Sequence, residues 1–247
     1  MNNIIETSRG LMLATAFLSM IGLVTPSMAQ DAGADAAIEV VRHGIPHDAL
    51  YAVEISGSNG VAVGAFGLML ETADGGASWT TVPAQTPLAL LGVARAGDKQ
   101  IVVGQQGLVM TRAGDGDWTK TESGIEQRLL NVAMNDAGVA VSVGEFGFVA
   151  VSRDAGASWQ SVTIDWEQHN EEGYEPHLYD AFVDKDGSIL IAGEFGLILR
   201  STDGGATFVG VNSADESIFD MYMARDGSNT GYAVGQEGLI LKTTDRG

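Results

Sequence analysis

The sequence predicts an all-β fold, a β-propeller of about five four-stranded blades. A Gly-x-x-Gly motif recurs five times, short apolar runs flank each copy, and an aspartate-containing turn motif follows most copies at a fixed distance. The units repeat at intervals of roughly 40 residues, which is the length of one four-stranded blade. With 247 residues, 45% of them hydrophobic, the chain can bury the core of one such array.

The amino-terminal residues have the pattern of an export signal. Arg9 precedes an apolar run over residues 11–24, and small residues end at Ala29. The apolar run falls short of the roughly 20 residues that a membrane-spanning helix needs. We therefore expect a signal peptide over residues 1–29, a flexible linker over 30–36 and the propeller over 37–247, in a periplasmic or secreted protein. An uncleaved membrane anchor is the less favoured alternative.

Charge and cysteine content exclude several functions. The chain has no cysteine, which excludes disulfides, thiol catalysis and cysteine metal sites. Its 13 basic and 32 acidic residues give a net charge of −19, which argues against binding to nucleic acid or to an anionic membrane surface. Two explanations of the acidic charge stay open. The acidic surface could bind a partner with basic patches, or it could serve only to keep the protein soluble.

Each Gly-x-x-Gly motif is predicted to be a tight turn between two strands. The runs before and after it are short and rich in aliphatic residues, and glycine tolerates the positive φ that tight turns require. A further apolar run opens each unit, so that each repeat holds about four strands. The motifs lie at 64–67, 104–107, 144–147, 193–196 and 235–238, and the opening runs at 50–53, 90–93, 129–132, 178–181 and 218–221.

A second motif, Thr/Ser-x-Asp-Gly-Gly-x-Ser/Thr-aromatic, is predicted to make the next turn. Its aspartate can cap the backbone N–H groups of its own turn, and the aromatic residue can fill the space beneath the following strand. The aspartates are Asp74, Asp154, Asp203 and Asp245, whereas the second repeat has Ala113 at this position.

The repeat spacing locates an insertion between the third and fourth units. Asp154 lies 80 residues after Asp74, which is two repeats, and Asp245 lies 42 residues after Asp203, which is one, whereas Asp203 lies 49 residues after Asp154. The additional residues lie in the segment 164–177, which is polar, acidic and aromatic. Because long loops on rigid scaffolds often carry function, this segment is a candidate site.

Closure of the array is predicted to involve the segment 37–41. The last repeat reaches Gly247 before the aromatic residue and outer strand that its predecessors have. Residues 37–41 have the composition of a lone strand and could supply that outer strand, which would join the first blade to the last. The alternative is that the sequence is a piece of a larger propeller.

The two motifs together resemble the BNR or Asp-box repeats of bacterial sialidase-like proteins, and most closely the photosystem II assembly and stability factor family of β-propellers. The resemblance covers residues 48–247 approximately. It implies a non-catalytic scaffold, without a cofactor, that assists assembly or stability of a membrane protein complex. Similar proteins in non-photosynthetic bacteria accompany envelope transport systems. The resemblance therefore implies a membrane complex or transporter as partner, and photosynthesis only for photosynthetic members. We further expect a monomer that does not insert into the membrane after signal cleavage.

The alternative function is that of a sialidase-like glycan-binding or glycan-cleaving propeller. A sialidase requires an arginine cluster, a Tyr/Glu nucleophile pair and an Asp acid. The mature chain has few arginines, and four of them, Arg112, Arg153, Arg200 and Arg246, lie in or beside the predicted rim turns. We therefore expect no catalytic residues.

The candidate partner-binding residues lie in the insertion and in the hairpins. They are Trp166, Glu167, Tyr174 and His177, together with Glu145, Glu194 and Glu237. The hairpin glutamates could act as acid and base, but positions repeated between blades favour a structural role. For the repeated phenylalanines Phe66, Phe146 and Phe195 we expect packing between neighbouring blades, with a platform for a ligand as the less favoured alternative. Histidines and glutamates of the insertion could hold a metal, but their spacing favours a solvated loop without one.

Overall fold

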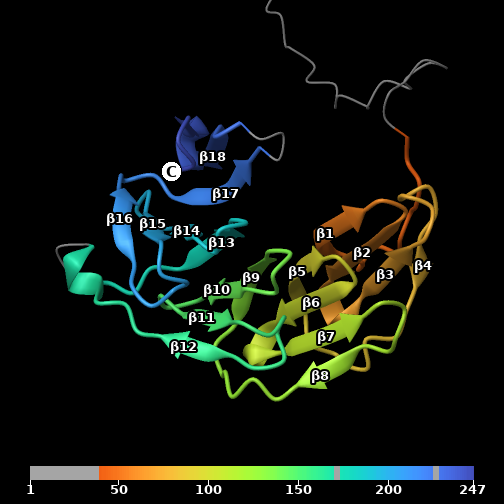
Figure 1. The fold of residues 1–247 in the computed structure, drawn as a ribbon. Coiled ribbons are helices and arrows are strands. Elements are labelled where there is room, and N and C mark those ends of the chain that lie inside the picture. Colours follow the sequence, from red (N-terminus) through yellow and green to blue (C-terminus); the bar gives the residue numbers. More distant parts are fainter. Residues whose placement is uncertain (1–38, 170–172, 225–227) are drawn as a thin grey trace, which may run out of the picture. The chain divides into compact units, whose positions relative to one another are not determined.

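Five antiparallel sheets follow one another around a common axis in the computed structural model (Figure 1), which describes residues 39–169, 173–224 and 228–247. Residues 40–247 form one unit. The predicted signal peptide 1–29, the linker 30–36 and the first two residues of the segment 37–41 lie outside the described residues.

Four sheets have four strands each, and the fifth has three. Within each sheet the strands pair in chain order, from the innermost strand outward, as in a propeller blade. The predicted fold class is therefore confirmed. The strands are β1 (Leu50–Ser56), β2 (Asn59–Gly64), β3 (Met69–Thr72) and β4 (Thr80–Thr81) in blade one; β5 (Leu90–Ala96), β6 (Lys99–Gly104), β7 (Val109–Ala113) and β8 (Thr119–Thr121) in blade two; β9 (Leu129–Met134), β10 (Ala140–Gly144), β11 (Val149–Ser152) and β12 (Gln160–Val162) in blade three; β13 (Leu178–Val183), β14 (Ile189–Gly193), β15 (Ile198–Ser201) and β16 (Val209–Asn212) in blade four; and β17 (Ile218–Met223), β18 (Gly231–Gly235) and β19 (Ile240–Thr243) in blade five.

The Gly-x-x-Gly motifs join the second and third strands of every blade, as the sequence predicts. The first glycine is required because the chain that enters the innermost strand passes directly over it. A Cβ at Gly64 would lie 1.9 Å from the Ala49 carbonyl oxygen, and one at Gly193 would lie 2.2 Å from that of His177. The second glycine takes a positive φ, for example +65° at Gly147. These hairpins therefore hold the start of the innermost strand in place.

Apolar side chains fill the spaces between successive blades. In blades two, three and four the aromatic residue of the turn motif packs into the cluster that the blade shares with the preceding one. Trp118 lies against the cluster between blades one and two, Trp159 against that between two and three, and Phe208 against that between three and four. The predicted plug beneath the outer strand is thus a plug between blades.

The aspartate turn is built from side-chain hydrogen bonds that repeat from blade to blade. In blade one the Thr72 hydroxyl donates to Asp74 at 2.7 Å and accepts from the Gly76 N–H at 2.9 Å. Asp74 also accepts from the Ser78 N–H at 2.9 Å and from its hydroxyl at 2.6 Å. Blades three and four repeat the pattern around Asp154 and Asp203. At Asp245 the Thr243 hydroxyl makes the corresponding bonds.

These contacts predict a loss of stability in acid. Hydrogen bonds from the Ser78 side chain and backbone, and then from Thr72, lower the pKa of Asp74 from 3.8 to about 2. A lowered pKa stabilises the fold above the pKa of the unfolded chain, and this stabilisation is lost as the pH falls through the folded value. We expect Asp74→Ala to unfold at a lower urea concentration than the wild type at pH 6, and the two midpoints to converge between pH 4 and pH 2. Asp117→Ala, at an exposed aspartate, is the control. A constant difference down to pH 2 would contradict the assignment.

The predicted closure by residues 37–41 is wrong for the residues that the structure describes. Val40 and Val41 lie in no strand and are 67% and 48% exposed, and the sheet of blade five ends at β19. The chain instead folds back locally, where the Asp48 N–H donates to the Ile45 carbonyl and Arg42 pairs with Asp48. Apolar side chains of blades one and five are exposed in the described residues, for example Val53 at 59% and Ile240 at 69%.

Candidate partner-binding face

One end of the blades carries both the Gly-x-x-Gly hairpins and the connections that enter the innermost strands. In blade three the Gly147 N–H donates to the Pro176 carbonyl at 2.7 Å, and in blade four the Glu194 N–H donates to the His177 carbonyl at 3.0 Å. The insertion 164–177 therefore lies against the hairpins of blades three and four. We call this region the hairpin face of blades three and four.

Trp166 holds the insertion to the blades. It lies in a single 3-10 turn, Trp166–Gln168, and is only 8% exposed. Its indole packs into the cluster between blades three and four, next to Gly147. The sequence suggests Trp166 as a partner-binding residue, but the structure gives it a packing position. Glu167, beside it, is exposed.

His177 and Glu194 connect the insertion to the hairpin of blade four. The His177 N–H donates to Glu194 Oε2 at 2.8 Å, and the Tyr179 hydroxyl donates to Glu194 Oε1 at 3.2 Å. Burial, followed by the charge of Glu194, raises the pKa of Tyr179. The His177 Nδ1 accepts from the Phe146 N–H at 3.1 Å. These bonds order the surface between the two hairpins.

Three exposed aromatic side chains lie on this ordered surface. Phe146 is 63% exposed with its ring 5.1 Å from that of His177, and Phe195 is 44% exposed with its ring 6.3 Å from that of Tyr174. Tyr174 itself is 58% exposed. We call Phe146, Tyr174, His177 and Phe195 the aromatic cluster.

The expected packing of the hairpin phenylalanines between blades is wrong. Phe66 is 79% exposed, and all three phenylalanines point outward. The reason is their backbone conformation. Each occupies the second position of the turn with a φ of 54° to 58°, a left-handed conformation that non-glycine residues rarely adopt. This conformation carries the side chain away from the sheet instead of into it.

The hairpin glutamates serve different roles. Glu194 accepts a backbone N–H in the same way as Gln105, which accepts from the Ala89 N–H at 2.9 Å in blade two. Glu145 instead pairs with Arg128 at 2.9 Å. Glu237 is exposed on the hairpin of blade five, one blade beyond the aromatic cluster. Glu194 therefore has the structural role that its repeated position favours, because it accepts the backbone N–H of His177 at the entry to the innermost strand.

The rim arginines join neighbouring blades at the opposite end. Arg112 pairs with Glu71 at 2.6 Å and lies over the Trp118 ring, and Arg153 donates to the Gly204 carbonyl at 2.9 Å. Arg246 forms an ion pair with Asp184. Their guanidinium groups are therefore engaged in blade-to-blade contacts and do not converge on a common ligand position.

The structure shows one buried carboxyl that sequence reasoning missed. Asp180, on β13, is 6% exposed and bridges three innermost strands. It accepts from Asn131 Nδ2 of β9 and from the Met221 N–H of β17, both at 2.7 Å. Burial is the main reason why its pKa is raised to about 7, and nearby Asp220 contributes. Comparison of the third residue of each innermost strand would have revealed it, because small residues there give way to Asn131, Asp180 and Asp220.

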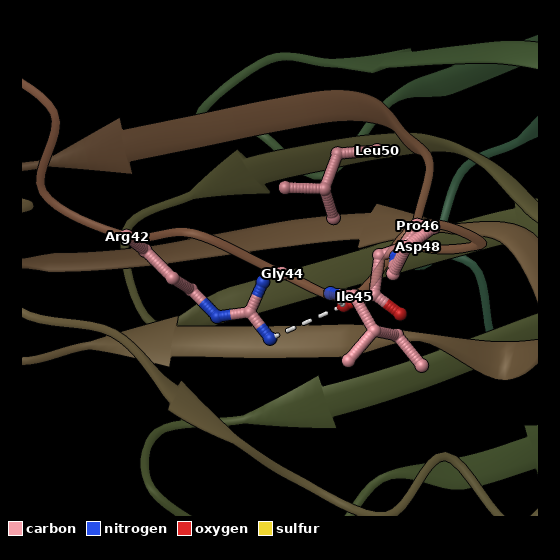
Figure 2. A pocket seen from close by; sticks show the side chains of 6 residues that line it. All are labelled: Arg42, Gly44, Ile45, Pro46, Asp48 and Leu50. Atoms are coloured by element: carbon pink, nitrogen blue, oxygen red, sulfur yellow. Dashed lines mark hydrogen bonds and ion pairs between the residues drawn. The ribbon is translucent and has the colours of Figure 1, made fainter.

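A hollow of about 390 Å³ lies beside β1 (Figure 2). Its polar groups are Arg42 and Asp48, which pair with each other at 3.5 Å. The lining residues are Arg42, Gly44, Ile45, Pro46, Asp48 and Leu50.

Neither a metal site nor a membrane-spanning helix is found in the described part of the chain. No group of three or more His, Asp or Glu residues there is placed to hold a metal ion. The helical turns in these same residues are too short to cross a membrane.

The sequence matches no protein-family model and no curated protein. Solved structures do match. A YCF48 structure bound to a D1 peptide has a TM-score of 0.59 and 17% identity, and the match covers 80% of this chain and 65% of that chain. YCF48 from Cyanidioschyzon merolae has a TM-score of 0.61 and 19% identity, over 79% and 66% of the two chains. PorZ, a surface component of the type-IX secretion system of Porphyromonas gingivalis, has a TM-score of 0.55 and 16% identity, over 79% and 25%.

These comparisons bear on the fold. The chain spans about two thirds of the length of the YCF48 chains that it matches. At identities below 20%, the likeness shows that the chain has the architecture of a β-propeller.

Proposed function

We propose that the chain is a non-catalytic, exported β-propeller that binds a segment of a membrane protein complex or transporter and assists the assembly or stability of that complex. The hairpin face of blades three and four is the proposed binding surface. The observation that carries the proposal is the aromatic cluster, in which exposed rings stand on hairpins that are fixed by hydrogen bonds.

The exposure of the phenylalanine rings supports a binding role. The left-handed backbone at this turn position is common to all five hairpins, because Gln106 and Glu237 adopt it as well, so it belongs to the repeated turn. Phe146 and Phe195 at this position expose large apolar rings to water. Exposed rings do not stabilise the fold, whereas they suit contact with a partner.

Two further observations support the proposal. A propeller of similar architecture is known with a bound D1 peptide. The amino-terminal pattern that ends at Ala29 supports export to the periplasm or beyond. The glycan alternative would use stacking by Trp166 or Tyr174 and carboxylates such as Glu145 and Glu194. It has less support because Trp166 is buried, Glu194 is engaged by His177 and Tyr179, and Glu145 pairs with Arg128, which leaves Tyr174 as its exposed ring.

Site-specific photo-cross-linking in the native envelope tests the proposed function. A photoreactive phenylalanine analogue is placed at Phe146 or Phe195, and at Val209 as control, an exposed residue on the outer strand of blade four. We expect positions 146 and 195 to capture the same membrane protein and position 209 not to capture it. Capture of no specific protein at 146 and 195, or of the same proteins at all three positions, would overturn the proposal.

Replacement of a cluster phenylalanine by glycine separates binding from stability. Phe146→Gly relieves the left-handed strain, so we expect unchanged or slightly higher stability in urea, by up to about 1 kcal/mol. The same variant loses an exposed ring, so we expect at least about fivefold weaker co-purification of the captured protein. Phe66→Gly, on blade one, is the matched control and is expected to keep co-purification. Equal binding by the wild type and Phe146→Gly would remove the aromatic cluster from the site.

A further inference from the structure

The exposed phenylalanine rings of the aromatic cluster have carboxylates beside them. Both hairpins have the sequence Gly-Glu-Phe-Gly, so Glu145 precedes Phe146 and Glu194 precedes Phe195. Arg128 balances the charge of Glu145 at 2.9 Å. Glu194 instead accepts hydrogen bonds from uncharged groups, and within the described residues no basic side chain pairs with it. The hairpin of blade four therefore brings an unbalanced carboxylate next to an exposed ring.

The insertion adds two more carboxylates, beside Tyr174. Glu175 follows this residue directly and is exposed. Glu167 is also exposed, and its side chain reaches back to the residue before Tyr174, because a Cβ at Gly173 would lie 3.1 Å from Glu167 Cγ. Among the described residues neither glutamate forms an ion pair. The ring of Tyr174, which stacks on that of Phe195, thus has two carboxylates nearby.

The segments that build this surface bring no lysine or arginine to it. Residues 144–147, 164–177 and 193–196 contain neither residue type. Arg128 enters from the connection before β9, but it is engaged by Glu145. His177 Nδ1 accepts from the Phe146 N–H, so this ring nitrogen carries no proton in the structure. The surface therefore combines an apolar, aromatic centre with negative charge around it.

An exposed ring does not bring carboxylates with it in every blade. Blade one exposes Phe66 at 79%, but Ala65 holds the position that glutamate holds in blades three and four. The hairpin of blade one is therefore an internal control, in which the ring is present without the adjacent charge.

We propose that the aromatic cluster binds a polypeptide segment in which lysine or arginine side chains stand next to apolar ones. This inference rests on the proposed function and adds the chemistry of the partner. Apolar groups of the segment cover the rings of Phe146 and Phe195, and its basic groups pair with Glu167, Glu175 and Glu194 or lie over the rings. An acidic or uncharged segment would cover these carboxylates without giving them a partner, which is costly.

Selection from a random peptide library tests this chemistry without the native partner. Short peptides displayed on phage are bound to the immobilised full chain, and those that also bind the double variant Phe146→Gly with Phe195→Gly are removed. Phe66→Gly is the matched control and is expected to keep the selected peptides. We expect the selected peptides to contain more lysine and arginine than aspartate and glutamate, next to apolar residues. No selected peptide, or selected peptides without this excess, would overturn the proposal.

Charge reversal separates a local effect from the overall acidity of the chain. A selected peptide is labelled and titrated with the full chain, and anisotropy is measured. We expect Glu167→Lys with Glu175→Lys to bind it at least about tenfold more weakly. Asp115→Lys with Asp117→Lys, at exposed positions in the rim turn of blade two, changes the net charge equally and is expected to stay within about twofold. Equal weakening by the two double variants would overturn the proposal.

The proposed function and the partner chemistry fail in different ways. If cross-linking from positions 146 and 195 captures one membrane protein while the selected peptides are acidic or uncharged, the proposed function stands and the basic segment is wrong. If the selected peptides are basic while cross-linking captures no specific protein, the surface has the inferred chemistry and the proposed function is wrong.

Discussion

Replacement of Trp166 by alanine is expected to lower the free energy of unfolding by about 3 to 5 kcal/mol. The indole is 8% exposed and packs in the largest apolar cluster of the described residues, between blades three and four. Its removal leaves a cavity under the hairpin of blade three, because the ring is the nearest group to Gly147. Urea unfolding followed by circular dichroism measures the change.

The same substitution is also expected to weaken partner capture. Trp166 fixes the insertion that carries Tyr174 and His177, so its loss frees two members of the aromatic cluster. Tyr174→Ala is the matched control in the same segment. Because Tyr174 is 58% exposed, this variant should change stability by less than about 0.5 kcal/mol while it still weakens capture. An unchanged unfolding midpoint for Trp166→Ala would show that the indole is not a packing element.

Stability is expected to decrease as the pH rises from 4 to 7, through Asp180. Burial raises the pKa of Asp180 from 3.8 to about 7, so the folded protein retains a proton that the unfolded chain loses over this range. The folded state is therefore penalised progressively above pH 4, and the penalty levels off above pH 7. A difference of roughly three pKa units corresponds to a total on the order of 4 kcal/mol.

The comparison between wild type and Asp180→Asn isolates this effect. Other carboxyl groups titrate in both proteins, so the informative quantity is the difference between their slopes of stability against pH, measured by urea unfolding from pH 4 to 8. We expect the difference between the two slopes to correspond to the uptake of nearly one proton. Asp220→Asn alters only the smaller causes, the charge of Asp220 and its hydrogen bond with Asp180, and should leave most of the slope. Parallel slopes for the wild type and Asp180→Asn would contradict the assignment.

The repeats made much of the fold predictable. Each Gly-x-x-Gly indicates a position at which the backbone has no room for a side chain, because a side chain at Gly64 or Gly193 would collide with the carbonyl that crosses it. The aspartate motif likewise indicates local hydrogen bonds, such as those that Asp74 accepts from Ser78. Interactions of this kind depend on residues close in sequence, so the pattern alone contains them.

The side-chain directions and long-range contacts were less predictable. Apolarity alone suggested that Phe146 is buried, but its left-handed φ of 55° turns it outward. The polar surroundings of Trp166 suggested exposure, but the cluster between two blades accommodates its ring. The predicted pairing of residues 37–41 with the last blade was wrong for the described residues, because such pairing depends on contacts across the whole array, which no local pattern specifies.

The clusters between blades are unequal, and this difference sets the order in which parts of the molecule open. Twelve buried residues join blades three and four, whereas three join blades four and five. Local opening begins where the fewest buried contacts hold a unit in place. Blade five should therefore detach and return many times for each global unfolding event, with fast amide hydrogen exchange in β17–β19 and slow exchange in β10 and β14. Blades three and four carry the aromatic cluster, so the proposed binding face is expected to stay folded during these excursions.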